Sequence, residues 1–246
     1  MRKYRWQIEL AILLLLLSFI LYAIHYAIFA DAHHIFIYLL GDIAFMPIEV
    51  LVVSLVVHRA LSLREKRAKM EKLNMVIGMF FSELGTDFLS FLSDFDPHAD
   101  EIRKDLQVRD DWSSSQFKSM TTRLQCYEHS VDVTRLDLEK LRHILADKRD
   151  LLLRLIENPQ LLEHDTFTDL LWAVFHLAEE LNHRRRIADL PESDLKHIER
   201  DIKRAYSAVS CQWLSYMRHL KDNYPYLFSL AIRTNPFDKS ASPVVT

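Results

Sequence analysis

Two long apolar stretches in the first quarter of the chain constrain the fold more than any other feature. Residues 8–30 carry one charged side chain, Glu9, close to their start, and residues 35–57 carry two, Asp42 and Glu49. At about 1.5 Å per residue, each stretch makes roughly 34 Å of helix, which exceeds the ~30 Å hydrocarbon core of a bilayer. The sequence therefore predicts two membrane-spanning helices joined by a short connector.

Glycine is scarce in this chain, which contains only Gly41, Gly78 and Gly85. Folds built from strands need glycine and other turn residues at their hairpins, whereas this sequence repeats apolar side chains every three or four residues. We expect an all-α fold. A two-pass transmembrane helical hairpin (residues 1–58) is followed by a cytoplasmic helical bundle.

Lysine and arginine indicate which side of the membrane each end of a span faces. The connector of residues 31–34 contains neither, whereas both flanks of the hairpin are basic. Basic residues near the ends of spans are retained in the cytoplasm, so we expect both termini there. The basic residues after the second span could also bind anionic lipid headgroups. They are Arg59, Arg64, Lys66, Arg67 and Lys69.

A cleaved signal peptide is the rival interpretation of the first stretch. Ala30, Asp31 and Ala32 fit the small-x-small cleavage pattern after a basic start. The apolar stretch, however, is longer than the usual core of ~7–15 residues in signal peptides. We therefore favour a retained span and an integral membrane protein of the cell or inner membrane.

The polar side chains within the spans form two matching stripes. Asp42 and Glu49 are seven residues apart, so they lie within about 20° of each other around their helix. Ser18, Tyr22 and His25 share one face of the other helix. In an antiparallel hairpin, His25 has the depth of Asp42, while Ser18 and Tyr22 lie nearer the level of Glu49. We call these five residues the intramembrane polar seam.

Two interpretations of the polar seam remain open. In the first, hydrogen bonds between helices fix the hairpin or a homo-oligomer, at ~1 kcal/mol per bond. In the second, Asp42 and Glu49 line a proton or cation path. Two helices cannot enclose such a path, so it would require several chains in a ring. Both interpretations lead us to expect a homo-oligomer in the lipid bilayer.

The segment 59–95 is expected to be a long juxtamembrane amphipathic helix. From Met70 to Phe95 its apolar side chains recur every three or four residues. Acidic and hydroxyl side chains fill the opposite face, which includes Glu83 and Asp87 and lacks Lys and Arg. This composition favours packing in a helical bundle over lying on the membrane surface.

Residues 96–233 are expected to form the cytoplasmic helical bundle. Ser113 is a candidate cap for a shorter helix, and three long helical patterns follow it. The first begins near Asp132 or Thr134 and continues to Asn158, and the others begin at Thr166 and Pro191. Residues 234–246 are expected to be a flexible tail.

Only a few side chains suggest a metal site. His176, Glu180 and His183 lie on one predicted helix, with the Glu-x-x-His spacing that ferritin-like proteins use for metal ligands. These residues lie roughly opposite Val174, the centre of the apolar face, so we expect a charged surface instead.

Two other groups of residues are candidates for binding. Asp31, His33 and His34 in the connector could bind Zn²⁺ or sense pH, but three such residues in a flexible connector are a weak signal. Trp172 shares the polar side of its helix, and a Trp beside charged residues suits contact with a cytoplasmic protein partner.

The sequence gives no support to an enzyme. It contains no Gly-rich phosphate loop, nucleophile elbow or HExxH motif, so we expect neither catalysis nor a cofactor. A formal net charge of -3 provides no basic field for nucleic acid. Cys126 and Cys211 are far apart and fit free thiols. The sequence favours an oligomeric membrane protein with a cytoplasmic assembly or signalling module, and an oligomeric cation or proton channel is the alternative.

Overall fold

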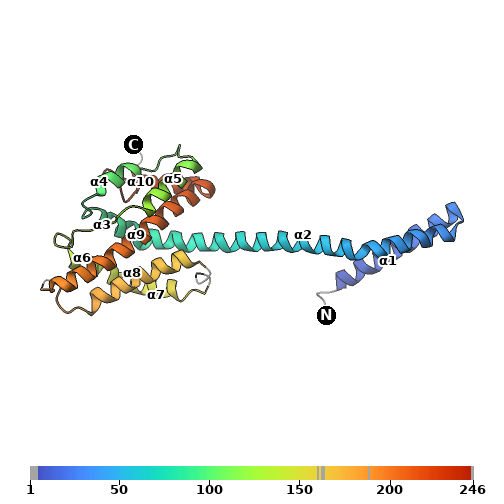
Figure 1. Ribbon diagram of the computed structural model, residues 1–246, viewed down its shortest axis with the longest axis horizontal. Coiled ribbons are helices and arrows are strands. Elements are labelled where there is room, and N and C mark those ends of the chain that lie inside the picture. Colours follow the sequence, from blue (N-terminus) through green and yellow to red (C-terminus); the bar gives the residue numbers. More distant parts are fainter. Residues whose placement is uncertain (1–4, 160, 162–163, 188, 245–246) are drawn as a thin grey trace. The chain divides into compact units, whose positions relative to one another are not determined.

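The computed structural model describes the chain except for residues 1–4, 160, 162–163, 188 and 245–246. Figure 1 follows its helices along the sequence. The chain divides into two compact units, Met1–Lys66 and Arg67–Thr246. The described residues contain helices and no strand, so the prediction of an all-α fold is confirmed.

The first unit consists of α1 (Arg5–Phe29) and the beginning of α2 (Ala32–Phe80). Between these helices the chain turns at Ala30, whose φ of 50° is left-handed. Asp31 then caps α2, since its Oδ1 accepts hydrogen bonds from the backbone N–H groups of His33 and His34 at 2.9 and 3.2 Å. The connector is therefore an ordered helix start.

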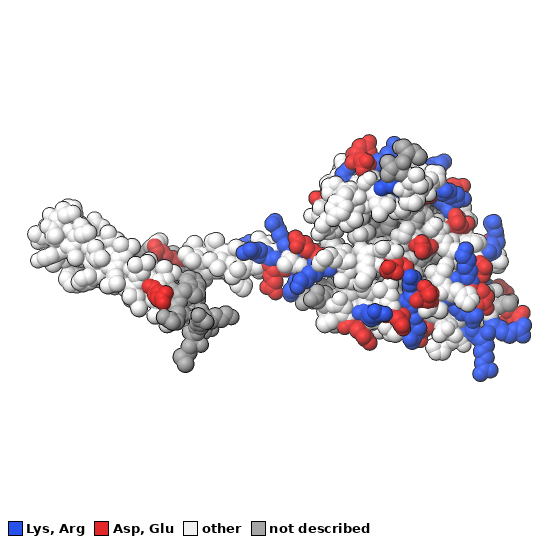
Figure 2. All heavy atoms as spheres, turned by 180° about the vertical axis from the view of Figure 1, so that it is seen from behind, with Lys and Arg blue, Asp and Glu red and all other residues white. Residues whose placement is uncertain are grey.

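The side chains of the first unit are apolar and exposed. Both helices are long and apolar enough to cross a membrane. The side chains of their most apolar segments are exposed. Figure 2 shows few charged side chains there, whereas Lys, Arg, Asp and Glu cover the second unit. Two helices alone offer too little surface to bury each other's side chains, which leaves a large apolar surface.

The second unit is a helical domain with one apolar core. After the end of α2 come η2 (Phe81–Gly85), α3 (Thr86–Ser93), α4 (Ala99–Asp105), α5 (Ser114–Gln125), α6 (Leu138–Asp147), α7 (Arg149–Ile156), α8 (Asp165–His183), α9 (Glu192–Asn223) and α10 (Pro225–Arg233). The 32-residue α9 is central, because α3, α5, α8, α10 and η2 all pack against it. It begins directly after Pro191, where the sequence predicts it.

The apolar stripe that starts at Met70 enters the core of this domain from Leu73 onward. Within α2 the first buried side chain is Leu73, and Ile77 and Phe80 follow at helical spacing. They belong to the same core cluster as side chains of α9. Side chains from both segments, 59–95 and 96–233, therefore pack into one core.

One predicted helix is two helices in the structure. The pattern expected to start near Asp132 or Thr134 begins instead after Asp137, whose side chain accepts from the Lys140 N–H at 2.9 Å. Asp132 closes a turn by accepting from the N–H and hydroxyl groups of Thr134. The pattern then breaks at Lys148, between α6 and α7.

The flexible tail expected for residues 234–246 is wrong for its first part. Asn235 is buried, and its Nδ2 donates to the carbonyl of Leu106 at 2.8 Å. Phe237 is 2% exposed, and its ring centroid lies 5.1 Å from that of Trp213. The sequence does not reveal this contact, because a single aromatic side chain in a polar segment shows no periodicity. In the structure, Phe237 holds the segment against the core.

Candidate functional site

The first unit contains a groove between α1 and α2 of about 480 Å³. Four residues of the polar seam line it, namely Ser18, Tyr22, His25 and Asp42. Glu49, the fifth, does not line this groove. The hairpin thus gathers four of the five residues of the polar seam in one groove and leaves Glu49 outside it.

His25 is the most enclosed of these residues. Its ring stacks on His34, with centroids 6.0 Å apart and planes 3° from parallel, and lies 4.8 Å from the ring of Phe29. Its Nδ1 is buried without a hydrogen-bond partner. The sequence places His25 at the depth of Asp42, but the Nδ1 atom of His25 makes no hydrogen bond with that carboxylate.

The remaining sequence candidates are dispersed. The basic residues after the second span, Arg59, Arg64, Lys66, Arg67 and Lys69, are exposed on α2. Trp172 is 51% exposed on α8, with its ring 6.1 Å from that of Phe175. In the connector, Asp31 caps α2 while the His34 ring contacts Tyr38, so these residues do not converge on a common point.

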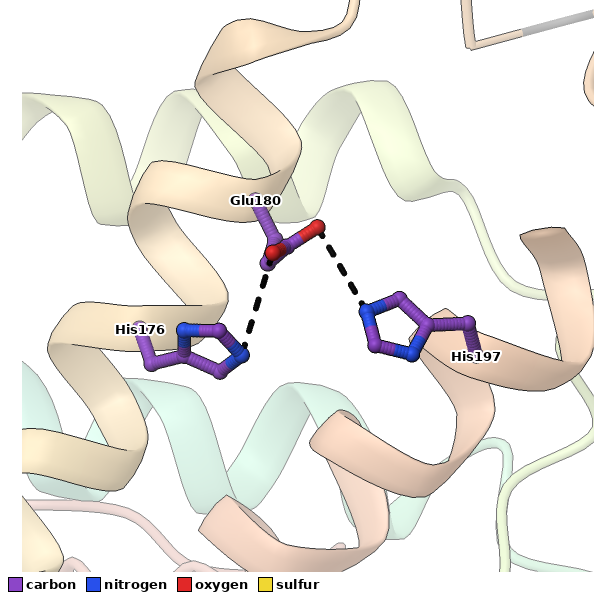
Figure 3. A group of neighbouring side chains, drawn as sticks. All are labelled: His176, Glu180 and His197. Atoms are coloured by element: carbon purple, nitrogen blue, oxygen red, sulfur yellow. Dashed lines mark ion pairs between the residues drawn. The ribbon is translucent and has the colours of Figure 1, made fainter.

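A cluster of histidines and carboxylates lies between α8 and α9 (Figure 3). His176 and Glu180 occupy one face of α8 at i and i+4, and His197 and Asp201 occupy one face of α9 at the same spacing. The two helices are antiparallel, so Glu180 lies opposite His197 and His176 lies opposite Asp201. We call these four residues the α8–α9 site.

The histidine Nε2 atoms point into the middle of this site. From Asp201 Oδ2, the Nε2 atoms of His176 and His197 lie 3.4 and 3.3 Å away. The carboxylate of Glu180 is 3.8 Å from His176 Nε2 through Oε1 and 3.6 Å from His197 Nε2 through Oε2. Two imidazoles and two carboxylates therefore surround one small space.

Burial differs sharply across the site. The side chain of Asp201 is 3% exposed, whereas those of Glu180, His197 and His176 are 28%, 40% and 45% exposed. Asp201 Oδ2 is buried and has no hydrogen-bond partner, although two imidazole nitrogens lie within 3.4 Å. A buried carboxylate oxygen without a partner is costly, so this atom calls for a physical explanation.

Arg184 holds the position of Glu180. Its Nη1 donates to Glu180 Oε2 at 2.7 Å, and its Nε and Nη2 donate to the carboxylate of Asp194 at 2.8 and 2.6 Å. The hydrogen bond from Arg184 is the main reason that the pKa of Glu180 lies below its usual value. The same guanidinium lowers the pKa of Asp194. Both groups are thus carboxylates at neutral pH.

The structure adds a second helix to the sequence interpretation of this region. His176 and Glu180 were expected on a charged surface away from the core; their side chains are 45% and 28% exposed, and they also face Asp201 and His197 of α9. His183, the expected partner of Glu180, stays outside the site, where its exposed ring contacts the Glu179 carbonyl through Nδ1 at 2.8 Å. Among the described residues, the group positioned to hold a metal ion is His176, Glu180 and His197.

Sequence reasoning missed His197 and Asp201. A usable signal was present, because His-x-x-x-Glu in one helix is followed by His-x-x-x-Asp in the next. Two such pairs meet when consecutive helices pack side by side in opposite directions. This signal can be used only if one knows that α8 packs against α9. The periodicity of a single helix does not show that.

Comparisons with known proteins agree with the division into two units. Residues 2–61 match the family model described as MJ1433, N-terminal helical domain, and residues 69–233 match Uncharacterized protein MJ1433, C-terminal helical domain. Uncharacterized protein MJ1433 of Methanocaldococcus jannaschii is 45% identical over 241 residues, which cover 98% of this chain and 97% of the relative. No solved structure matches the chain. The chain therefore belongs to the MJ1433 family.

Proposed function

We propose that this protein is a two-pass, oligomeric membrane protein whose cytoplasmic helical domain serves as an assembly or signalling module. The observation that carries the proposal is the contrast between the two units. The first exposes its apolar side chains, while the second buries one continuous apolar core beneath a charged surface. A bilayer covers the first surface, because each helix satisfies its own backbone hydrogen bonds in lipid.

Basic residues support the orientation of the hairpin. Arg59 and Arg64 follow the second apolar segment on exposed positions of α2, and the connector contains neither Lys nor Arg. Because basic residues near the ends of spans are retained in the cytoplasm, we expect both termini there. The same side chains then lie at the level of anionic headgroups, where each contributes about 1 kcal/mol to lipid binding.

Glu49 supports the oligomer. An ionised acid in the middle of a span costs ~2.5–3.5 kcal/mol on insertion scales when it faces lipid. The groove that receives Asp42 does not include Glu49. A neighbouring chain is the remaining source of polar partners, so we expect the membrane helices to associate through the face that bears Glu49, Phe45 and Met46.

Cysteine labelling tests the topology. In a background with Cys126→Ala and Cys211→Ala, single cysteines are introduced as Ala32→Cys in the connector and Ser242→Cys near the C-terminus. A membrane-impermeant maleimide should label the first in intact cells and the second only after permeabilisation. Labelling of the Ser242→Cys variant in intact cells would contradict the cytoplasmic assignment.

The mass of the detergent-solubilised protein tests the oligomer. We expect a multiple of the chain mass of 29.1 kDa, and Glu49→Leu should weaken or rearrange the assembly. Disulfide crosslinking of Phe45→Cys or Met46→Cys variants should link neighbouring chains. A monomer in gentle detergents, together with attack on these positions by lipid-dissolved probes, would argue against membrane association of the chains.

A second candidate function, a proton or cation path, is favoured by the groove that brings Tyr22, His25 and Asp42 together. Protein reconstituted in liposomes with a pH-sensitive dye separates the two functions. An assembly module gives the same flux as empty liposomes, and the double variant Asp42→Asn, Glu49→Gln leaves its oligomer intact. A path gives protein-dependent flux that the double variant changes.

A further inference from the structure

We propose that the α8–α9 site binds one divalent transition-metal ion, for which Zn²⁺ fits best, through His176, Glu180, His197 and Asp201. The bound ion joins the two longest helices of the second unit. The site lies within the second unit and requires neither the membrane topology nor oligomerisation.

The spacing of the four side chains matches a tetrahedral ion. Ligand atoms at ~2.0–2.1 Å from Zn²⁺ in a tetrahedron stand about 3.3–3.4 Å apart. The contacts of Asp201 Oδ2 with His197 and His176 are 3.3 and 3.4 Å, and Glu180 Oε2 lies 3.6 Å from His197. The ligand atoms of the two histidines and Glu180 all lie within 4.8 Å of one another. Asp201 is not a member of that group of three, so its carboxylate must rotate to complete the coordination sphere.

The donor set selects the class of ion. Two imidazole nitrogens suit Zn²⁺, Co²⁺ and related ions, whereas Ca²⁺ and Mg²⁺ prefer oxygen ligands alone. With both imidazoles neutral, Glu180 and Asp201 supply two negative charges, which balance a divalent cation. Two arginines also lie beside these carboxylates. Arg184 pairs with both Glu180 and Asp194, and Nη1 of Arg204 lies 3.4 Å from Oδ1 of Asp201.

The buried carboxylate of Asp201 is a second feature that indicates a bound ion. Its Oδ2 is buried, lacks a hydrogen-bond partner and is directed at the two histidine Nε2 atoms. One cation between the carboxylates and the neutral imidazoles satisfies every group at once.

The surroundings suit a metal site in two further respects. Arg184 fixes the Glu180 carboxylate by a hydrogen bond, as residues behind metal ligands commonly do. The histidine side chains are 45% and 40% exposed, so an ion can reach them from solvent. Asp201 forms the buried base of the site.

The first experiment measures binding by the full-length protein in detergent, with its affinity tag removed and endogenous metal extracted by EDTA. Equilibrium dialysis with Zn²⁺ at neutral pH should give one ion per chain. Co²⁺ should produce the strong visible absorption of a tetrahedral site. Asp201→Asn and His197→Gln should each weaken Zn²⁺ binding by at least about tenfold. Ca²⁺ and Mg²⁺ should not compete.

His183→Gln is the matched control. It removes a histidine from the same helix, three residues after Glu180, but outside the site. This variant should bind Zn²⁺ as the wild type does. Unchanged Zn²⁺ binding by Asp201→Asn, or absence of stoichiometric binding by the wild type, would overturn the proposal.

Thermal unfolding distinguishes a metal site from a network of ion pairs. Zn²⁺ should raise the melting temperature of the wild type and of His183→Gln, and raise that of Asp201→Asn by less. If Asp201→Asn does not fold, the more exposed His197→Gln replaces it. A wild type that Zn²⁺ does not stabilise would contradict the proposal.

Discussion

Arg184 and Asp194 form a two-point ion pair that closes the connection between α8 and α9. The guanidinium Nε and Nη2 donate in parallel to Oδ2 and Oδ1 of the carboxylate, at 2.8 and 2.6 Å. The Arg184 side chain is only 15% exposed, and it also donates to Glu180. This pair sets the alignment on which the α8–α9 site depends.

Replacing Arg184 with Lys should lower the free energy of unfolding by about 1–3 kcal/mol. A lysine ammonium is a single point charge, so it cannot hold both oxygens of Asp194 and Glu180 in the same geometry. Denaturant unfolding followed by tryptophan fluorescence measures the change. Arg186→Lys is the control, because the pair of Arg186 with Asp189 is exposed and should change stability by less than about 0.5 kcal/mol. Equal losses in both variants would contradict the prediction.

Gly85→Ala should destabilise the protein by about 1–3 kcal/mol. An added Cβ would lie 2.5 Å from Cδ1 of Phe81 and 2.8 Å from Cε1 of Phe80. Both rings are buried in the core, so they cannot move aside freely. Elsewhere in a helix, the same change is stabilising by up to about 1 kcal/mol.

Gly41→Ala is the matched control for that substitution. A Cβ at Gly41 meets nothing within 4 Å in the chain. This variant should be as stable as the wild type or slightly more stable when both are compared by thermal unfolding. If Gly85→Ala and Gly41→Ala have the same melting temperature, the core around Phe80 adjusts to the added methyl group, and the prediction is wrong.

Much of the secondary structure follows from local signals in the sequence. Pro191 marks the start of α9, for which it is the N-cap residue, because proline disfavours helical backbone in the residue before it. Ser113 forms the expected cap, accepting from the Gln116 N–H while the Gln116 side chain accepts from the Ser113 N–H. Such signals act within a few residues, so they can be read without knowledge of the fold.

Packing between elements could not be predicted in this way. Apolar periodicity identified the face of α8 around Val174, but it could not show that His197 and Asp201 of α9 lie against His176 and Glu180. Asp201 reads as one more acid in a charged helix, and only the crowding of α8 and α9 buries it. The α8–α9 site is therefore a product of tertiary structure.

Phe237→Ala should cost about 3–5 kcal/mol of stability. The side chain is 2% exposed and packs edge-on against Trp213, so its removal leaves a cavity. Val244→Ala is the control, since Val244 is 66% exposed and should change stability by less than about 0.5 kcal/mol. Both are measured by thermal unfolding. If Phe237→Ala melts like the wild type, the segment after Arg233 contributes nothing to the core.

His129 should make the second unit less stable in mild acid. Its side chain is buried between the rings of Tyr127 and Tyr206, each with its centroid 4.8 Å away, and its Nδ1 contacts the Tyr127 carbonyl at 3.2 Å. Burial is the main cause that lowers the pKa of His129 from 6.5 to about 4. The folded protein therefore resists protonation of this imidazole, whereas the unfolded chain accepts the proton near its ordinary pKa.

The direction of the pH effect follows from these two pKa values. Above pH 6.5 neither state binds the proton, so the full stability is present; between pH 6.5 and about 4 only the unfolded state binds it, and stability falls. The total loss from this group is about 3 kcal/mol. Metal-free protein is unfolded by denaturant across this pH range to measure it. His129→Gln should be less stable near neutral pH but show a flatter decline, while the exposed His143→Gln should follow the wild type. A decline of equal slope in His129→Gln and the wild type would assign the pH dependence to other groups.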